Sequence, residues 1–119
     1  MSVGPDEPAR VVVVDDDRLI REMVRDAIGK RARVECCESS EAALEALHRE
    51  PADLIVSDLT MPGLSGIELL EEVRRTYPAT DFMLLTANAT VESAVGALRM
   101  GAADYLSKPV SGDELALVV

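Results

Sequence analysis

The chain has 119 residues, enough for one domain with its own core, and its low aromatic content of 3% favours helices packed on an aliphatic sheet. Its 22 acidic and 12 basic residues give a formal net charge of −10, which repels nucleic acid and anionic membranes, so we expect it to bind neither. A membrane span needs about 18 consecutive apolar residues, and no apolar run in the sequence is nearly so long. The adjacent Cys36 and Cys37 are poorly placed for a disulfide. The sequence therefore predicts a soluble, cytoplasmic protein.

The first part of the chain has the order strand, helix, strand, after a mobile tail that we place at residues 1–9. Residues 11–14 are four consecutive valines, a pattern typical of a strand buried on both faces. The helix that follows has Asp17 available as its N-cap and Gly29 as its stop. A weaker strand is predicted at residues 33–37.

The centre of the chain delivers one carboxylate to the end of a buried strand. A helix opened by Ser39 and ended by Pro51 precedes the apolar residues 54–56, and Asp58 follows this run almost at once. The next helix, which we expect to end near Thr76, has a clear start signal. It consists of a capping box and a hydrophobic staple, formed by Ser65 with Glu68 and by Leu64 with Leu69.

The last third of the chain contains two more strands, at residues 82–85 and 104–107, which end next to Thr86 and Lys108. Between them lies a helix, capped by Thr90, that carries few charges. We expect its inward side chains to be Val91, Ala94, Val95 and Leu98, with Ala97 and Met100 off this stripe. A final helix has a start signal but no stop before Val119, so we expect a folded domain at residues 10–119 that is truncated within this helix.

Strands alternating with helices predict an α/β fold, because right-handed crossovers produce an open, doubly wound parallel sheet with helices on both faces. In such a sheet, the loops at the carboxyl ends of the strands form the binding crevice. The polar side chains expected at that end are Asp15, Asp16, Asp58, Thr86 and Lys108.

These side chains indicate a phosphoryl site built on a metal ion. Three carboxylates brought together cannot all ionise cheaply unless a cation joins them, and oxygen ligands favour Mg²⁺. Thr86 would then donate a hydrogen bond to a phosphoryl group, Lys108 would neutralise its charge, and Asp58 would be the nucleophile. The plainer alternatives are that the paired aspartates only cap a helix, that the threonine is structural and that the lysine is solvated. The ordered set of residues favours the site.

The motifs VVVVDDD, SDLTMPGLSG, LLTANA and DYLSKPV, in this order, resemble the receiver domains of bacterial two-component response regulators over residues 10–119. The resemblance implies a flavodoxin-like fold whose five-stranded sheet has the order 2-1-3-4-5. It also implies the roles of the site residues. Asp58 would be the phosphoacceptor, and Mg²⁺ would be held by Asp15, Asp16, Asp58 and the Thr60 carbonyl. The phosphoryl group would be contacted by Thr60, Thr86, Ala87 and Lys108. Tyr105 would move with Thr86.

The function implied by the resemblance is a signalling switch and not a metabolic enzyme. A sensor histidine kinase or phosphotransfer protein would donate the phosphoryl group, and the domain would catalyse only this transfer and its own dephosphorylation. The stretch at residues 88–109 is similar to receivers of sigma-54-dependent transcription activators, so we expect a C-terminal output domain and a role in transcription. We also expect a homodimer face made by the helix after Thr90, the strand at Tyr105 and the last helix.

Two other classes of protein share parts of this pattern. A phosphatase of the haloacid dehalogenase type also uses a strand-end aspartate with Mg²⁺, but its motif continues to a threonine where this chain has Leu19. A flavodoxin-type cofactor binder shares the fold but needs a phosphate-binding loop after the first strand. The three aspartates at that place would repel a phosphate.

Overall fold

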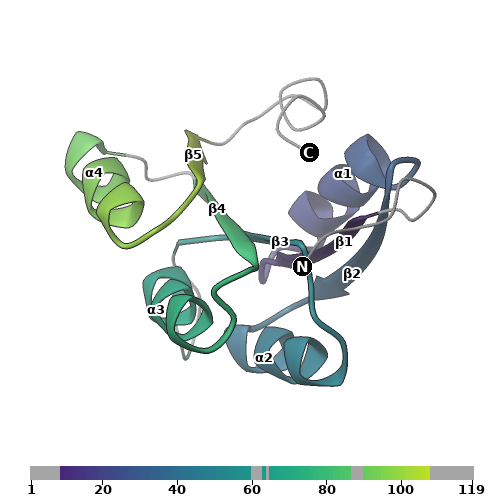
Figure 1. The fold of residues 1–119 in the computed structure, drawn as a ribbon. Helices are drawn as coiled ribbons and strands as arrows, with labels where there is room; N and C mark the ends of the chain where they lie inside the picture. Colours follow the sequence, from purple (N-terminus) through teal and green to yellow (C-terminus); the bar gives the residue numbers. More distant parts are fainter. Residues whose placement is uncertain (1–8, 60–62, 64, 87–89, 108–119) are drawn as a thin grey trace.

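The computed structural model describes residues 9–59, 63, 65–86 and 90–107, and strands and helices alternate through this part of the chain. The strands are β1 (Ala9–Val14), β2 (Ala32–Cys37), β3 (Leu54–Ser57), β4 (Asp81–Thr86) and β5 (Asp104–Ser107). The helices are α1 (Arg18–Ile28), α2 (Ser40–Arg49), α3 (Gly66–Thr76) and α4 (Val91–Arg99). All neighbouring strands pair in parallel, in the order β2-β1-β3-β4-β5, which confirms the predicted fold (Figure 1).

The sheet separates two apolar clusters, because successive side chains of a strand point to opposite faces. Val12 and Val14 of β1 join the cluster that includes residues of α2 and α3, whereas Val11 and Val13 join the cluster that includes residues of α1. Figure 1 shows α1 on the other side of the sheet from α2 and α3. The valine run of β1 is therefore buried on both faces, as predicted.

The predicted start signals of three helices are confirmed. The Asp17 carboxylate accepts the Leu19 amide at 2.9 Å, and the Ser39 hydroxyl accepts the Ala42 amide at 3.1 Å. At α3, Ser65 and Glu68 form both hydrogen bonds of the capping box. Each of these bonds satisfies an amide that has no partner within its helix.

Helix α4 presents a different face to the core from the one we predicted. Ala97, expected off the inward stripe, is fully buried, whereas Val95 and Leu98 are 42% and 50% exposed. The residues of α4 are small or apolar on most sides, so hydrophobic periodicity does not specify which face turns inward. The side chain of Ala97 is small enough for the helix to lie close to the core cluster that contains Phe82.

The end of α4 fits against α3. Gly101 has φ of +101°, a left-handed conformation that favours glycine directly after a helix. A Cβ at this position would lie 2.6 Å from Cδ of Arg74, so the glycine also makes room for an arginine side chain of α3. Among the described residues, no helix has the length and apolar character needed to cross a membrane.

Candidate functional site

Three carboxylates meet at the carboxyl end of the sheet. Val14 of β1 lies opposite Ser57 of β3, so the residues that follow these strands are brought side by side. The Asp58 amide donates to the Val14 carbonyl at 2.9 Å, which extends the pairing to the site itself. One carboxylate oxygen from each of Asp15, Asp16 and Asp58 lies within 4.8 Å of the other two. The predicted meeting of the three aspartates is confirmed.

Two of the three aspartates are held firmly and the third faces solvent. Asp15 and Asp58 are only 2% and 9% exposed, whereas Asp16 is exposed. One oxygen of Asp15 accepts the Asp17 amide and one of Asp58 accepts the Leu59 amide, each at 2.9 Å. These bonds fix the two carboxylates through their own turns, so the cluster is already arranged in the folded chain.

Helix α3 begins directly against the peptide that carries Asp58. The Gly66 amide donates to the Leu59 carbonyl at 2.9 Å, and a Cβ on Gly66 would overlap the Asp58 carbonyl oxygen. Only glycine fits such a close backbone approach. We did not predict a role for this residue from the sequence. The available signal was a glycine at the first position of a well-capped helix, where better helix formers are common.

The cluster suits a hard divalent cation. All of its donor atoms are carboxylate oxygens, and oxygens this close repel one another unless a positive charge lies between them. Mg²⁺ is held by few carboxylates and keeps several of its waters, which matches a cluster with one solvent-exposed member. The residues present therefore fit the predicted metal, which Asp15, Asp16 and Asp58 would hold.

The structure places part of the predicted phosphoryl-binding set. Thr86 ends β4 and is 1% exposed. Because Ser57 lies opposite Leu84, Thr86 reaches one ladder step beyond the level of Asp58. Tyr105 lies opposite Leu84 in the backbone pairing of β4 with β5. The other predicted members, Thr60, Ala87 and Lys108, lie outside the described residues, as does the last helix.

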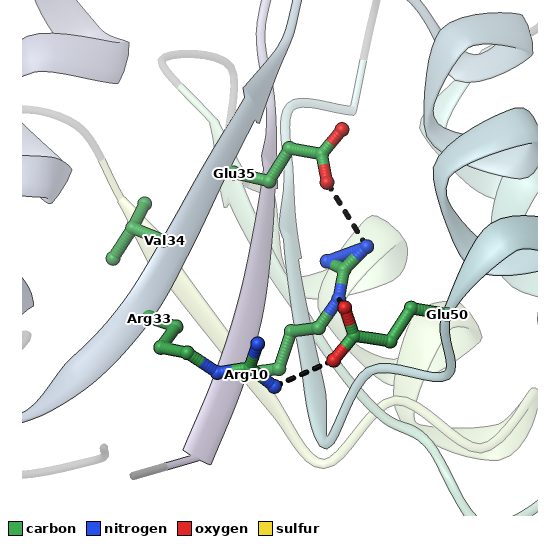
Figure 2. A pocket seen from close by; sticks show the side chains of 5 residues that line it. All are labelled: Arg10, Arg33, Val34, Glu35 and Glu50. Atoms are coloured by element: carbon green, nitrogen blue, oxygen red, sulfur yellow. Dashed lines mark hydrogen bonds and ion pairs between the residues drawn. The ribbon is translucent and has the colours of Figure 1, made fainter.

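The opposite end of the sheet holds a charged cluster of another kind. Arg10 of β1 is 4% exposed and forms ion pairs with Glu35 at 2.9 Å and Glu50 at 3.4 Å. Arg33 pairs with Glu50 at 2.6 Å and Arg49 with Glu35 at 2.8 Å, so each carboxylate has two cationic partners. Arg10, Arg33, Glu35 and Glu50 line a cleft of about 190 Å³, and Figure 2 shows how these side chains lie. Every charged group in this cluster has a partner of opposite sign, which favours a structural role.

The two cysteines differ in their surroundings. Both are free thiols, with Cys37 buried in one apolar cluster and Cys36 half-buried against the other, because successive side chains of a strand point to opposite faces of the sheet. Burial raises the pKa of Cys37 to about 11 from its ordinary 9.0, with Glu35 and Cys36 as smaller causes. Cys37 is therefore an unreactive part of the core near neutral pH.

Comparison with known proteins agrees with this geometry. A family model described as the response regulator receiver domain matches residues 11–119. The response regulator FleR of Pseudomonas aeruginosa is 46% identical over 103 residues, which are 85% of this chain and 22% of FleR. The DNA-binding transcriptional regulator NtrC of Proteus hauseri is 38% identical over 116 residues, which are 94% of this chain and 24% of NtrC. The chain thus spans about a quarter of the length of these relatives.

A solved structure supports the same assignment. The BeF3-activated receiver domain of DrrB, a Thermotoga maritima protein, superposes with a TM-score of 0.87 at 30% identity and covers 93% of both chains. A match along almost the whole chain argues against the haloacid dehalogenase phosphatase and the flavodoxin-type cofactor binder.

Proposed function

The chain belongs to the response regulator receiver domains of two-component systems, and on this premise we propose that it is a Mg²⁺-dependent switch that is phosphorylated on Asp58. The observation that carries the proposal is the cluster of Asp15, Asp16 and Asp58, with oxygens within 4.8 Å of one another. A sensor histidine kinase or a phosphotransfer protein supplies the phosphoryl group, and we place the protein in the cytoplasm with such partners.

The chemistry proposed for Asp58 is nucleophilic. Its carboxylate oxygen attacks the phosphorus of a phosphohistidine, the P–N bond breaks as the new P–O bond forms, and the imidazole leaves. The Leu59 amide bonds one oxygen of Asp58 at 2.9 Å, which orients the carboxylate and limits its rotation. Mg²⁺, when bound, would offset the negative charge that gathers on the carboxylates and the phosphoryl oxygens. The domain catalyses this transfer and its own dephosphorylation, and no other reaction.

The remaining site residues stabilise the phosphorylated state in this proposal. Thr86 donates a hydrogen bond to the phosphoryl group, and Lys108 and the main chain at Ala87 and Thr60 complete its binding. The position of Thr86 at the end of β4, one ladder step beyond Asp58, supports its part. Movement of Thr86 then changes the environment of Tyr105, which passes the signal to the neighbouring surface.

The output proposed for this switch is a change in self-association that controls transcription through a C-terminal domain. Support comes from the relative NtrC, which is named as a DNA-binding transcriptional regulator, and from the exposed apolar side chains of α4. Val95 and Leu98 are 42% and 50% exposed, and a partner helix would remove this apolar surface from water. These two residues define the α4 face, which is the surface to probe for the dimer, whereas Ala97 is fully buried.

A phosphodonor experiment tests the core of the proposal. With Mg²⁺ and acetyl phosphate, mass spectrometry of the intact protein should show the gain of one phosphoryl group. Asp58→Asn should gain none, because an amide cannot form the acyl phosphate. Modification of Asp58→Asn to the same extent as the parent protein would refute Asp58 as the acceptor. Chelation of Mg²⁺ is the second control and should suppress the gain.

Sedimentation tests the dimer separately. BeF3 should strengthen self-association of the parent protein, and Leu98→Asp should remove this increase because it places a charge on the α4 face. Glu92→Asp, also in α4, conserves the charge and serves as the control. An association constant that BeF3 leaves unchanged would exclude a dimer that phosphorylation strengthens and would leave the phosphorylation chemistry untouched.

A further inference from the structure

Arg21, in the second turn of α1, contacts the carboxylate site, although this arginine is not part of any sequence motif that we assigned to the site. Its Nη1 atom donates to the main-chain carbonyl of Asp15 at 2.7 Å. This is a charge-assisted hydrogen bond from a half-buried guanidinium to a residue that is 2% exposed. Within the described part of the chain, Arg21 forms no ion pair with any carboxylate, so this carbonyl is a principal partner of its charge.

The contact occurs where the strand pairing of β1 ends. The Asp15 amide still donates to the Cys37 carbonyl at 3.1 Å, but β2 ends at Cys37 and the chain then turns into α2. A buried carbonyl at such a point needs a donor from elsewhere. The side chain of Arg21 reaches back from the helix and provides it.

The two aspartates of the buried pair are held in the same way. Each has one carboxylate oxygen bound by an amide of its own turn, from Asp17 and from Leu59. Each also has its main-chain carbonyl bound by a side-chain donor, which is the Ser57 hydroxyl at 2.9 Å for Asp58 and Arg21 for Asp15. The main chain and the carboxylate of Asp15 are thus fixed together, and Arg21 provides the link to α1.

Helix α1 is itself anchored at this residue. The Arg21 amide donates to the Asp17 carbonyl at 3.2 Å, and the thiol of Cys36 lies 3.9 Å from the Arg21 carbonyl. These two contacts hold the main chain of Arg21 within α1 and against β2, and its side chain adds the contact to the Asp15 carbonyl.

From these contacts we infer that Arg21 is a positioning residue for the cation site, holding the turn after β1 so that Asp15 and Asp16 present their carboxylates beside Asp58. The inference rests on the proposed function, because it concerns the metal that the three carboxylates would hold. It assigns Arg21 no contact with the metal or the phosphoryl group. Its effect passes through the main chain of Asp15.

Charge and positioning predict opposite effects when Arg21 is replaced. Removal of a positive charge near a cation site should strengthen Mg²⁺ binding by simple electrostatics. Loss of the hydrogen bond to Asp15 should weaken it, because residues that orient metal ligands commonly change affinity by about 10–100-fold when they are replaced. A lower affinity in Arg21→Gln therefore cannot come from the change in charge.

Calorimetric titration with Mg²⁺ measures this effect. We expect Arg21→Gln to bind about tenfold more weakly than the parent protein. Arg21→Lys, which keeps the charge and a single donor, should recover part of the affinity. The matched control is Arg25→Gln, an exposed arginine one turn further along the same helix, which should bind Mg²⁺ as tightly as the parent protein or slightly more tightly. An Arg21→Gln affinity equal to or above that of the parent protein would overturn the inference.

Amide exchange in the metal-free protein provides a readout that is independent of the metal. The Asp17 amide donates to the Asp15 carboxylate at 2.9 Å and should exchange faster in Arg21→Gln than in Arg25→Gln. Equal exchange in the two variants would contradict the positioning role even if the parent protein bound no Mg²⁺. Absence of Mg²⁺ binding by the parent protein, with faster exchange in Arg21→Gln, would instead refute the proposed metal and preserve the role of Arg21.

Discussion

The two ends of the sheet differ in how their charged side chains are arranged. At the amino end, Arg10 is buried between two glutamates, and each glutamate has a further arginine partner. At the carboxyl end, Asp15, Asp16 and Asp58 bring three carboxylates together, with one oxygen of each within 4.8 Å of the other two. A cluster in which each charge has a partner of opposite sign stabilises the fold, whereas a cluster of like charges is suited to bind an ion of opposite charge. The contrast separates the structural end of the sheet from the functional end.

The largest effect that we predict is at the contact between α3 and the Asp58 peptide. Gly66→Ala should lower the free energy of unfolding by about 3 kcal/mol, because its Cβ would overlap a backbone carbonyl that cannot rotate away. Urea denaturation measures the loss. The control is Gly96→Ala in α4, where a Cβ would meet nothing within 4 Å and helix propensity should add about 0.5–1 kcal/mol. Equal stabilities of the two variants would show that α3 can move away from Asp58.

A smaller loss is expected when the amino-end cluster is broken. Arg10→Met should lower the free energy of unfolding by about 2 kcal/mol, because it removes two ion pairs and the hydrogen bond from Arg10 to the Ala46 carbonyl. The remaining arginine partners of Glu35 and Glu50 limit the loss. Mg²⁺ binding should be unchanged in this variant, which a titration can verify. A weaker Mg²⁺ affinity would mean that the two ends of the sheet are coupled.

Removal of a charge at the carboxyl end of the sheet should raise the free energy of unfolding, in contrast to the loss at the amino end. In the absence of divalent cations, Asp58→Asn should raise the free energy of unfolding by about 1 kcal/mol, because it removes one of three charges that repel each other. The side-chain oxygen of asparagine can still accept the Leu59 amide, so the hydrogen bond is kept. Denaturation in the presence of a chelator provides the measurement. Destabilisation by Asp58→Asn would show that the cluster is already neutralised by the protein.

The smallest effect that we predict is a change in how the stability of the protein depends on acidic pH. The hydrogen bond from Arg33 is the main cause that lowers the pKa of Glu50 below its ordinary 4.5. A lowered pKa in the folded state means that this pair contributes stability above about pH 4.5 and loses that contribution as the pH falls through the folded value. Glu50→Gln should therefore lose less stability than the parent protein between neutral and acidic pH.

The matched control for this effect is Glu71→Gln, an exposed position on α3 for which the described residues offer no ion pair. Denaturation midpoints over a pH series provide the comparison. An acid response of Glu50→Gln equal to that of the parent protein would show that the Arg33 contact is too solvated to matter.

The sequence was sufficient to predict the strands and the functional carboxylates because both depend on local signals. Four valines in succession indicate a strand buried on both faces, and Asp58 stands directly after another such strand. Parallel pairing then brings strand ends together without further information. The capping box of Ser65 and Glu68 is equally local, since both residues lie within one turn.

The contacts that sequence reasoning missed depend on packing between elements. Arg21 is one of several arginines on α1, and only the docking of that helix on β1 selects it for the Asp15 carbonyl. The role of Gly66 arises from the distance between α3 and the Asp58 peptide. The inward face of α4 could not be predicted for a related reason, because a helix with small and apolar residues on most sides has no distinct polar face to orient it.

The measurement that tests the central claim most directly is the stability increment that Mg²⁺ produces in three proteins. At a Mg²⁺ concentration of about 100 times Kd, the parent protein should gain about 2.7 kcal/mol in its free energy of unfolding. Arg10→Met should start from a lower stability and gain the same increment, whereas Asp16→Asn, altered at the carboxyl end, should gain much less. An increment that persists in Asp16→Asn, or that is lost in Arg10→Met, would contradict the assignment of the cation site to the carboxyl end of the sheet.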